Sequence, residues 1–279
     1  MASQNTVNNQ YLGVRELKEE VFLDTHGVEQ TKSVTVATEN VEGTAIEQIV
    51  AGHILGKNED DSLFYPLAYD AAQSAVSGAN VIEVEESRMF RVGDLVELPT
   101  SVAADATRFR KVAAVDHDAG TITLDGGTFS LNEGDTFEVD PTRSYGFVPS
   151  GGGATSATIQ LGTGEAARFA VGDKVEVGDD GGGPYDVDAV DTGADTITLG
   201  TSIAHSGDDI VVSQKNGDYR ICIKSVNTVE HSRFFDQKFT HNNVDVPTRP
   251  HGEVDEPALW GLTPDAKSEL ENMIIFTTL

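Results

Sequence analysis

Apolar and polar residues alternate along much of the middle of the chain. The clearest runs lie at 81–84, 96–98 and 121–124, and they recur at 158–161, 175–177 and 196–199. A period of two puts successive side chains on opposite faces of a strand, so each run predicts a short strand with one buried face. Turns rich in Gly and Asp separate the runs, which favours antiparallel pairing. The pattern predicts an all-β protein.

The alternating runs belong to two copies of one sequence pattern. Residues 90–98 return as 169–177 with Phe, Val, Gly, Asp, Val and Glu at matching places, and the block 112–124 returns as 187–199. The order of the blocks is kept. Repetition of this kind indicates a duplicated structural unit. Duplicated β modules usually present surface and build interfaces, so the repeat favours a structural role over catalysis.

Regions outside the repeat have a different character. Both ends of the chain contain strand patterns, and Thr263 before Pro264 predicts the start of a short helix. We predict two tandem small β-barrel or sandwich modules on a mixed, mostly β base. The predicted segments are residues 1–78 (N-terminal arm and β base), 79–140 (first module), 154–215 (second module) and 217–279 (C-terminal base segment with the helix). Residues 151–153, all glycine, are predicted to form a flexible joint between the modules.

Charge narrows the choice of partners. The chain has 46 Asp and Glu residues against 19 Lys and Arg residues, a formal net charge of −27. A charge of this sign opposes binding to nucleic-acid phosphate or to an anionic membrane, so we expect neither partner. A Lys-poor acidic surface suits concentrated salt, where the Debye length falls to about 3 Å at 1 M. We interpret the chain as a halophile's protein; an acidic protein from low salt is the alternative.

Targeting signals and cysteines give little information about the function of the chain. No apolar run approaches the ~18 residues of a membrane helix, and no signal peptide is recognisable, so we expect a protein made and used in soluble form. The one cysteine, Cys222, lies in an alternating run and is interpreted as a small packed side chain.

Candidate chemical motifs do not fit their contexts. The segment 162–164 contains two glycines after a predicted strand, but another strand follows at once, where a nucleotide site needs a long helix. His231, His241 and His251 are ten residues apart, which suits no single helix or strand face for zinc. The sequence contains no Gly-x-Ser-x-Gly motif. We therefore predict no enzyme activity, no catalytic residues, no metal ligands and no cofactor.

Paired Gly-Asp turns have a structural interpretation. Asp94 and Asp173 follow Gly at the same place in both copies, and Asp135 and Asp208 follow Gly in a second shared turn. A turn that shapes a module should recur in both copies, whereas an acid-base pair has no reason to. We therefore interpret these carboxylates as parts of turns.

Two groups of residues outside the repeat are candidates for an interface. Aromatic residues gather in the segment poorest in regular structure, and they either pack on the protein's own core or anchor a partner. The polar arm cannot repay the cost of its own ordering, about 1 to 2 kcal/mol per residue, without contacts outside its module. The predicted interface residues are Ser3, Asn5, Asn8, Gln10, Phe234, Phe235, Phe239 and Trp260.

The segment 50–57, VAGHILGK, followed by LFYPL at 63–67, resembles the head decoration proteins of tailed phages. In that family an Ala-Gly-x-x-Leu-Gly-Lys strand and turn precede a short strand that ends near a proline. The repeated blocks are similar to small β modules of phage head and tail proteins. With the acidic composition, the resemblance implies a virion protein of a tailed virus that infects a halophilic archaeon.

The resemblance also implies partners and a location. Family members bind the capsid lattice as oligomers and reinforce it, so the expected partners are the major capsid protein and further copies of this chain. A trimer is favoured, with a pentamer or hexamer as alternatives. The protein would be made in the host cytoplasm and would lie on the capsid exterior, as a non-enzymatic structural protein. The alternative is a projecting module that binds the host surface or belongs to the tail.

Overall fold

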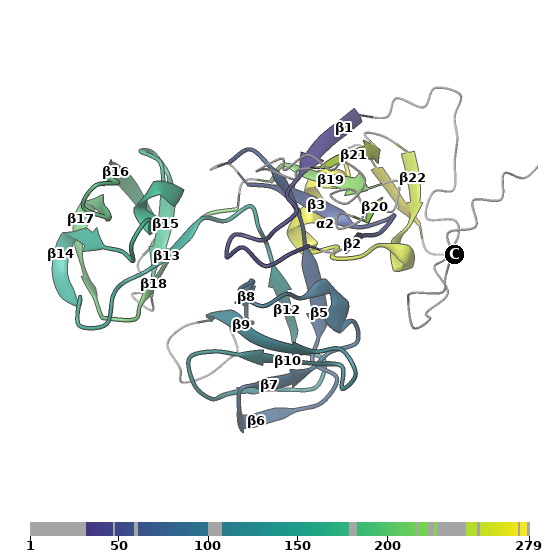
Figure 1. The fold of residues 1–279 in the computed structure, drawn as a ribbon, viewed down its shortest axis with the longest axis horizontal. Coiled ribbons are helices and arrows are strands. Elements are labelled where there is room, and N and C mark those ends of the chain that lie inside the picture. The colour runs from purple at the N-terminus through teal and green to yellow at the C-terminus, as the bar shows by residue number, and fades with distance from the viewer. Residues whose placement is uncertain are drawn as a thin grey trace, which may run out of the picture.

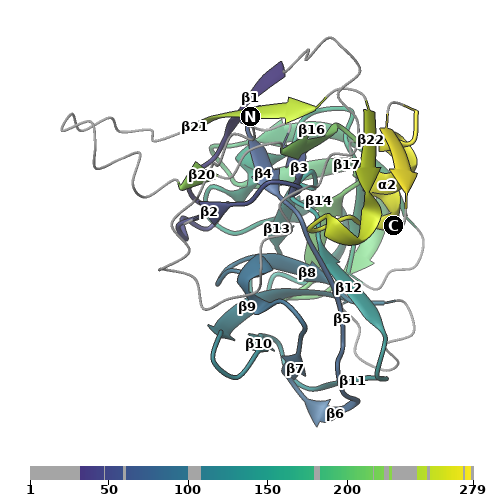
Figure 2. The ribbon, with the colours of Figure 1, turned by 90° about the vertical axis from the view of Figure 1, so that its right-hand side faces the viewer.

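The computed structural model describes residues 32–46, 48–58, 61–99, 108–178, 183–215, 217–222, 226–227, 244–249, 252–272 and 274–277. Strands predominate in these residues, so the all-β prediction is confirmed. The strands form three units, which we call the base, module 1 and module 2 (Figure 1). The base lies above module 1 in Figure 2, and module 2 lies to one side of both in Figure 1.

The base is a barrel built from both halves of the chain. Its five strands close in the order β1-β21-β19-β3-β4. They are β1 (Lys32–Val36), β3 (Ile54–Lys57), β4 (Phe64–Pro66), β19 (Tyr219–Cys222) and β21 (Val244–Arg249). Strands β3 and β4 are antiparallel, with Leu55 opposite Pro66, and form a hairpin. Cys222 is fully buried, as the alternating pattern around it predicts.

Smaller elements complete the base. The strands β2 (Gln48–Ile49) and β20 (Val226–Asn227) pair with each other, and β22 (Gly252–Asp255) pairs in parallel with β23 (Ile274–Thr277). The helix α2 (Pro264–Leu270) and the 3-10 turn η4 (Glu256–Ala258) lie between β22 and β23. The Thr263 hydroxyl accepts a hydrogen bond from the Ala266 N–H at 3.1 Å. The predicted helix start is therefore correct, because Thr263 supplies the cap that the first turn needs.

Module 1 is a curled six-stranded sheet in the order β5-β12-β8-β9-β10-β7. These strands are β5 (Ala68–Ala71), β7 (Val81–Glu83), β8 (Leu95–Glu97), β9 (Phe109–Asp116), β10 (Thr121–Leu124) and β12 (Thr136–Val139). A separate pair joins β6 (Val76–Ala79) to β11 (Phe129–Leu131), and the 3-10 turn η2 (Ser87–Met89) precedes β8.

Module 2 has the same strand order, β13-β18-β15-β16-β17-β14. The strands are β13 (Tyr145–Phe147), β14 (Ala154–Gln160), β15 (Lys174–Val177), β16 (Tyr185–Asp191), β17 (Thr196–His205) and β18 (Ile210–Ser213), with the 3-10 turn η3 (Glu165–Arg168) before β15. Register agrees as well as order. Leu124 lies opposite Val112 in module 1, and Leu199 lies opposite Val187 in module 2. In each module the register shifts immediately next to this pair. The predicted duplication is confirmed at the level of strand order and register.

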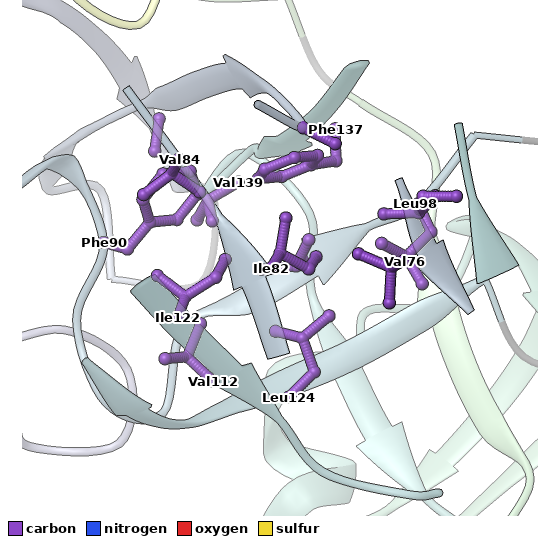
Figure 3. Close-up of a cluster of buried hydrophobic side chains, with 14 of the residues drawn as sticks. Val76, Ile82, Val84, Phe90, Leu98, Val112, Ile122, Leu124, Phe137 and Val139 are labelled. Carbon is purple, nitrogen blue, oxygen red and sulfur yellow. The ribbon is translucent and has the colours of Figure 1, made fainter. Parts of the chain in front are cut away.

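Alternating apolar residues form a separate core in each module. The residues predicted to face inward, Ile82, Val84, Val96, Leu98, Ile122 and Leu124, are all buried in one cluster with Phe90 and Phe137 (Figure 3). Their counterparts Ile159, Leu161, Val175, Val177, Ile197 and Leu199 are buried in a second cluster. Each module therefore has the hydrophobic core that the period-two pattern predicts.

The predicted limits of the modules need adjustment. Each sheet takes in one strand that lies before residues 79 and 154, namely β5 in module 1 and β13 in module 2. These strands pair with β12 and β18, so they belong to the sheets although they precede the repeated blocks. The link between modules is the short segment 140–144.

The three glycines at 151–153 do not separate the modules. They lie between β13 and β14 of one sheet. The Gly152 N–H donates to the Pro149 carbonyl at 2.8 Å, and a Cβ on Gly153 would lie 3.0 Å from the Ser206 Cα atom. The prediction of a joint between the modules was wrong, because the glycines serve a close-packed turn within module 2.

Candidate functional site

Most predicted interface residues lie outside the part of the chain that the structure describes. Ser3, Asn5, Asn8 and Gln10 are in the undescribed N-terminal segment, and Phe234, Phe235 and Phe239 are in the undescribed segment 228–243. The histidines at 231, 241 and 251 also fall outside the described residues. Their proposed roles stay predictions.

Trp260 is the one predicted interface residue that is described. It is partly buried and packs against the core of module 1. Its backbone belongs to the base: the Trp260 N–H donates to the Gly52 carbonyl at 3.1 Å, and its carbonyl accepts from the Ile54 N–H at 2.9 Å. Its ring lies 6.3 Å from that of His53. Trp260 therefore connects the base to module 1. It packs on the protein's own core, which is one of the two roles considered above for the aromatic residues.

Burial keeps His53 neutral near this contact. Loss of solvent lowers the pKa of His53 to about 4. One ring nitrogen, Nε2, donates to the Leu67 carbonyl at 2.8 Å. The imidazole is therefore a hydrogen-bonding part of the base rather than a group that titrates near neutral pH.

The Gly-Asp carboxylates close turns, as predicted. Asp94 accepts a hydrogen bond from the Arg91 N–H at 2.8 Å, and Asp173 accepts one from the Ala170 N–H at 2.7 Å. Asp135 accepts one from the Asn132 N–H at 2.8 Å. In each case the acceptor is three residues after the donor, so the carboxylate fixes the turn before a strand.

The fourth turn is displaced by one residue from its predicted position. Asp209, not Asp208, accepts the hydrogen bond, from the Ser206 N–H at 2.7 Å. Asp208 occupies the left-handed position with φ of 71°, where the other copy has Gly134 with φ of 87°. Aspartate tolerates a positive φ better than most residues. The residue equivalent to Gly134 is therefore Asp208 and not Gly207, the glycine that the sequence comparison had matched to it.

The three units meet at a site that we call the junction. A loop of the base, residues 38–45, reaches the Asp94 turn of module 1. The Asn40 side-chain amide donates to the Val92 carbonyl at 3.0 Å and to the Asp94 carboxylate at 2.8 Å. Burial raises the pKa of Asp94, although the nearby Arg91 charge and the Asn40 hydrogen bond act against that rise. The base loop therefore satisfies a buried carboxylate of module 1.

Glu42 of the same loop binds both modules. Its carboxylate lies 3.0 Å from the Lys111 Nζ atom of module 1 and 3.6 Å from an Arg168 guanidinium nitrogen of module 2. The Tyr145 hydroxyl of module 2 donates to it at 2.9 Å. Burial alone would raise the pKa of Glu42, but these hydrogen bonds and cations hold it below its usual value. Glu42 is therefore a charged link between all three units.

Aromatic and aliphatic side chains fill the space between the modules. Phe109 of module 1 clusters with Tyr145, Ile210 and Val212 of module 2, and Val41 of the base loop packs against them. Cations surround this cluster: Lys111 lies 4.5 Å from the ring centre of Phe147, and the guanidinium groups of Arg108, Arg143 and Arg168 lie 5.0 to 5.2 Å from Phe109 or Tyr145. Cation-π contacts of this kind gain strength where water is excluded.

Two arginines at the junction join module 1 to module 2. Arg108 lies 3.3 Å from the carboxylate of Glu97 and 2.9 Å from that of Glu176. Both glutamates occupy the same place in the repeat, since each lies opposite the third residue of the last strand of its module. Arg143 lies 3.2 Å from Glu97 and donates to the Ser213 carbonyl at 3.1 Å. Arg108 thus bridges the two equivalent acids across the module boundary, and Arg143 joins one of them to the backbone of module 2.

A second ionic cluster joins module 1 to the end of the chain. The Lys215 Nζ atom contacts the carboxylates of Glu138 in β12 and Asp265 in α2. Burial would lower the pKa of Lys215, but hydrogen bonds to these two carboxylates raise it. The Tyr219 hydroxyl donates to buried Asp140 at 2.7 Å. The base is therefore tied to the last strand of module 1 and to the start of the 140–144 link.

The side chains of the junction hold the three units together through ion pairs and hydrogen bonds. A pocket there has a lining without Ser, Thr, Cys, His or Lys. Within the described ranges, no group of three or more His, Cys, Asp or Glu side chains could hold a metal ion. No helix in the described part of the chain is long and apolar enough to cross a membrane.

Sequence patterns did not reveal the junction. Its cations come from segments with no motif, and its acids are spread over the base loop and two modules. One signal was available: β9 begins with Phe109, Arg110 and Lys111, a cluster of cations in a very acidic chain. No protein-family model matches this sequence, and no curated protein has a detectably similar one.

Proposed function

We propose that this chain is a non-enzymatic structural protein on the capsid exterior of a tailed virus, where it decorates and stabilises the shell. The observation that carries the proposal is the junction. Glu42, Arg108 and Arg143 each connect different β units. Charged groups held at interfaces in this way favour one relative arrangement of the units. A projecting body made of small domains needs that property to resist bending.

The proposed mechanism is mechanical. The base, with the undescribed arm and the aromatic segment 228–243, would contact the capsid protein and neighbouring copies. The modules would project outward. The resemblance of residues 50–57 and 63–67 to head decoration proteins supports this orientation, because these two segments include β3 and β4 of the base.

The acidic composition supports an exterior position. A net charge of −27 would be repelled by packaged DNA, whereas the outer face of the shell meets solvent. Concentrated salt would screen repulsion between copies on the lattice, since the Debye length at 1 M is about 3 Å.

The experiment is electron microscopy of purified particles of the virus that encodes this chain, with the copy number measured by mass spectrometry. Removing residues 1–10, or replacing Phe235 and Phe239 with Ser, is expected to abolish incorporation while the modules stay folded. The matched control is Val171→Ser, which changes an exposed side chain of module 2. It should leave incorporation unchanged.

The same particles test the alternative function. If the arm and aromatic variants are incorporated at the normal copy number, the proposed contact between these segments and the capsid protein is wrong. If Val171→Ser particles keep their copy number but adsorb poorly to cells, the host-binding function is favoured. Absence of the chain from purified particles would overturn both.

A further inference from the structure

The outer edge of module 2 is an unpaired strand. Among the described residues, β14 pairs with β17 on one side and with no strand on the other. Ala154, Thr155, Thr158 and Gln160 are exposed on it. Figure 1 shows β14 at the end of module 2 that is farthest from the base. An unpaired edge presents a row of backbone N–H and C=O groups that can accept another strand.

This edge is also uncharged in a chain that is otherwise strongly acidic. The stretch 144–164 contains no Asp, Glu, Lys or Arg, and neither does 196–207, which includes all of the neighbouring strand β17. Soluble proteins usually protect an edge strand with charged residues, with Pro or with an irregularity. Here β14 has neither a charge nor a proline along its seven residues, and its one irregularity is the register shift against β17 between Ser156 and Thr158.

Module 1 shows what a protected edge looks like in the same fold. Its corresponding edge is divided into β6 and β7 at Asn80, whose side chain and backbone both bond to Leu124. Gly78, in β6, has φ of +60°, and Glu83 at the end of β7 is exposed. A neutral edge formed by one undivided strand is therefore present in module 2 and absent from module 1.

Charge determines which partner fits this edge. Two copies of a chain with net charge −27 repel each other wherever acidic surfaces face, so a contact between copies is least costly at an uncharged edge. A strand that pairs with its own copy across a two-fold axis makes the same contact twice.

We propose that β14 pairs antiparallel with β14 of a second copy, so that the module 2 sheets of two copies form one continuous sheet. The contact would be made mainly by backbone hydrogen bonds. Ala157 has no partner in register on β17, because the register shifts between Ser156 and Thr158. It is therefore the position on β14 where a change disturbs the module least.

The test is sedimentation velocity of the full chain in molar salt over a series of protein concentrations. The wild type should form a dimer. Two variants should weaken dimerisation by roughly tenfold or more: Ala157→Pro, which removes an N–H from the strand, and Thr155→Lys, which places a charge on the edge. The matched control is Ser77→Lys, at the corresponding place in β6 of module 1, and it should dimerise as the wild type does.

Hydrogen exchange gives a second measurement on the same samples. Backbone amides in 154–160 should become more protected as the wild type dimerises, and thermal unfolding should show that each variant is folded. A wild type that stays monomeric at every concentration would overturn the proposal. Dimers that survive both β14 variants would also overturn it and would place the contact elsewhere, without affecting the proposed attachment of the base to a capsid.

Discussion

Modules 1 and 2 share strand order, register and turns, yet equivalent surfaces in them meet different surroundings. In module 1 the turn at Gly93 is covered by the base loop, and a Cβ on Gly93 would lie 2.7 Å from the Glu42 Cβ atom. The equivalent turn at Gly172 has nothing within 4 Å. The neighbouring valines differ in the same way, with Val92 44% exposed and Val171 67% exposed. The fold of a module is therefore independent of whether its turn is docked.

Cations are distributed as unevenly as contacts. Between residues 145 and 213 the only Lys or Arg residues are Arg168 and Lys174. Module 1 places Arg108 and Lys111 at the start of β9, where they contact module 2 and the base loop. The acidic modules are thus held together by cations that come mainly from one of them. Four predictions test this difference between shared cores and unshared surfaces.

The largest effects should come from the shared cores. Ile122 and Ile197 are equivalent and fully buried, so Ile122→Ala and Ile197→Ala should each destabilise the protein by about 2 to 5 kcal/mol. Urea unfolding at constant molar salt measures both. Similar losses support equivalent cores, and a loss in one variant only would contradict the equivalence.

The cores were predictable because each inward position follows a period of two within a few residues. The strands β5 and β13 were not. They precede the repeated blocks and share little sequence, although Tyr69 and Tyr145 occupy the same place against β12 and β18. A strand that joins a sheet through long-range pairing leaves a weak local signal.

The candidate site was harder to predict than the fold. Trp260 was predicted to contact a partner, but the described structure packs it against the module 1 core, a contact that no local pattern indicates. The junction depends on side chains far apart in sequence, such as Glu42 with Tyr145. Such contacts follow from the arrangement of whole domains, which the sequence pattern alone does not specify.

Docking should make one glycine more sensitive than its counterpart. Alanine in place of Gly172, where φ is +98°, should cost about 1 to 2 kcal/mol through backbone strain alone. Alanine in place of Gly93, where φ is +91°, adds a clash with Glu42 and should cost about 1 to 3 kcal/mol more. Urea unfolding measures the difference. Equal losses would show that the base loop moves away freely.

Acidification should weaken the link through Glu42. Because the pKa of Glu42 is lowered in the folded protein, its stabilisation is complete above its unfolded pKa, near 4.3, and is lost as pH falls through its folded pKa. Glu42→Gln should therefore cost about 1 kcal/mol at neutral pH and little at acidic pH. Subtracting the wild-type free energy of unfolding at each pH removes the contribution of Asp94. The pKa of Asp94 is raised, so its effect on stability changes with pH in the opposite direction. A difference that is constant with pH would exclude ionisation of Glu42 as the source.

The smallest effect on stability should come from an exposed ion pair of module 2, between Lys174 and Asp186. Lys174 and Asp186 lie 2.7 Å apart, but their side chains are 50% and 63% exposed. Water and salt screen such a pair, so Lys174→Ala should change stability by less than about 0.5 kcal/mol. Lys111, at the place in module 1 equivalent to Asp186, contacts Glu42 and two aromatic rings and is 23% exposed. Lys111→Ala should therefore cost more, about 1 to 2 kcal/mol. Urea unfolding in molar salt measures both variants, and equal costs would mean that docking adds nothing to the charges of module 1.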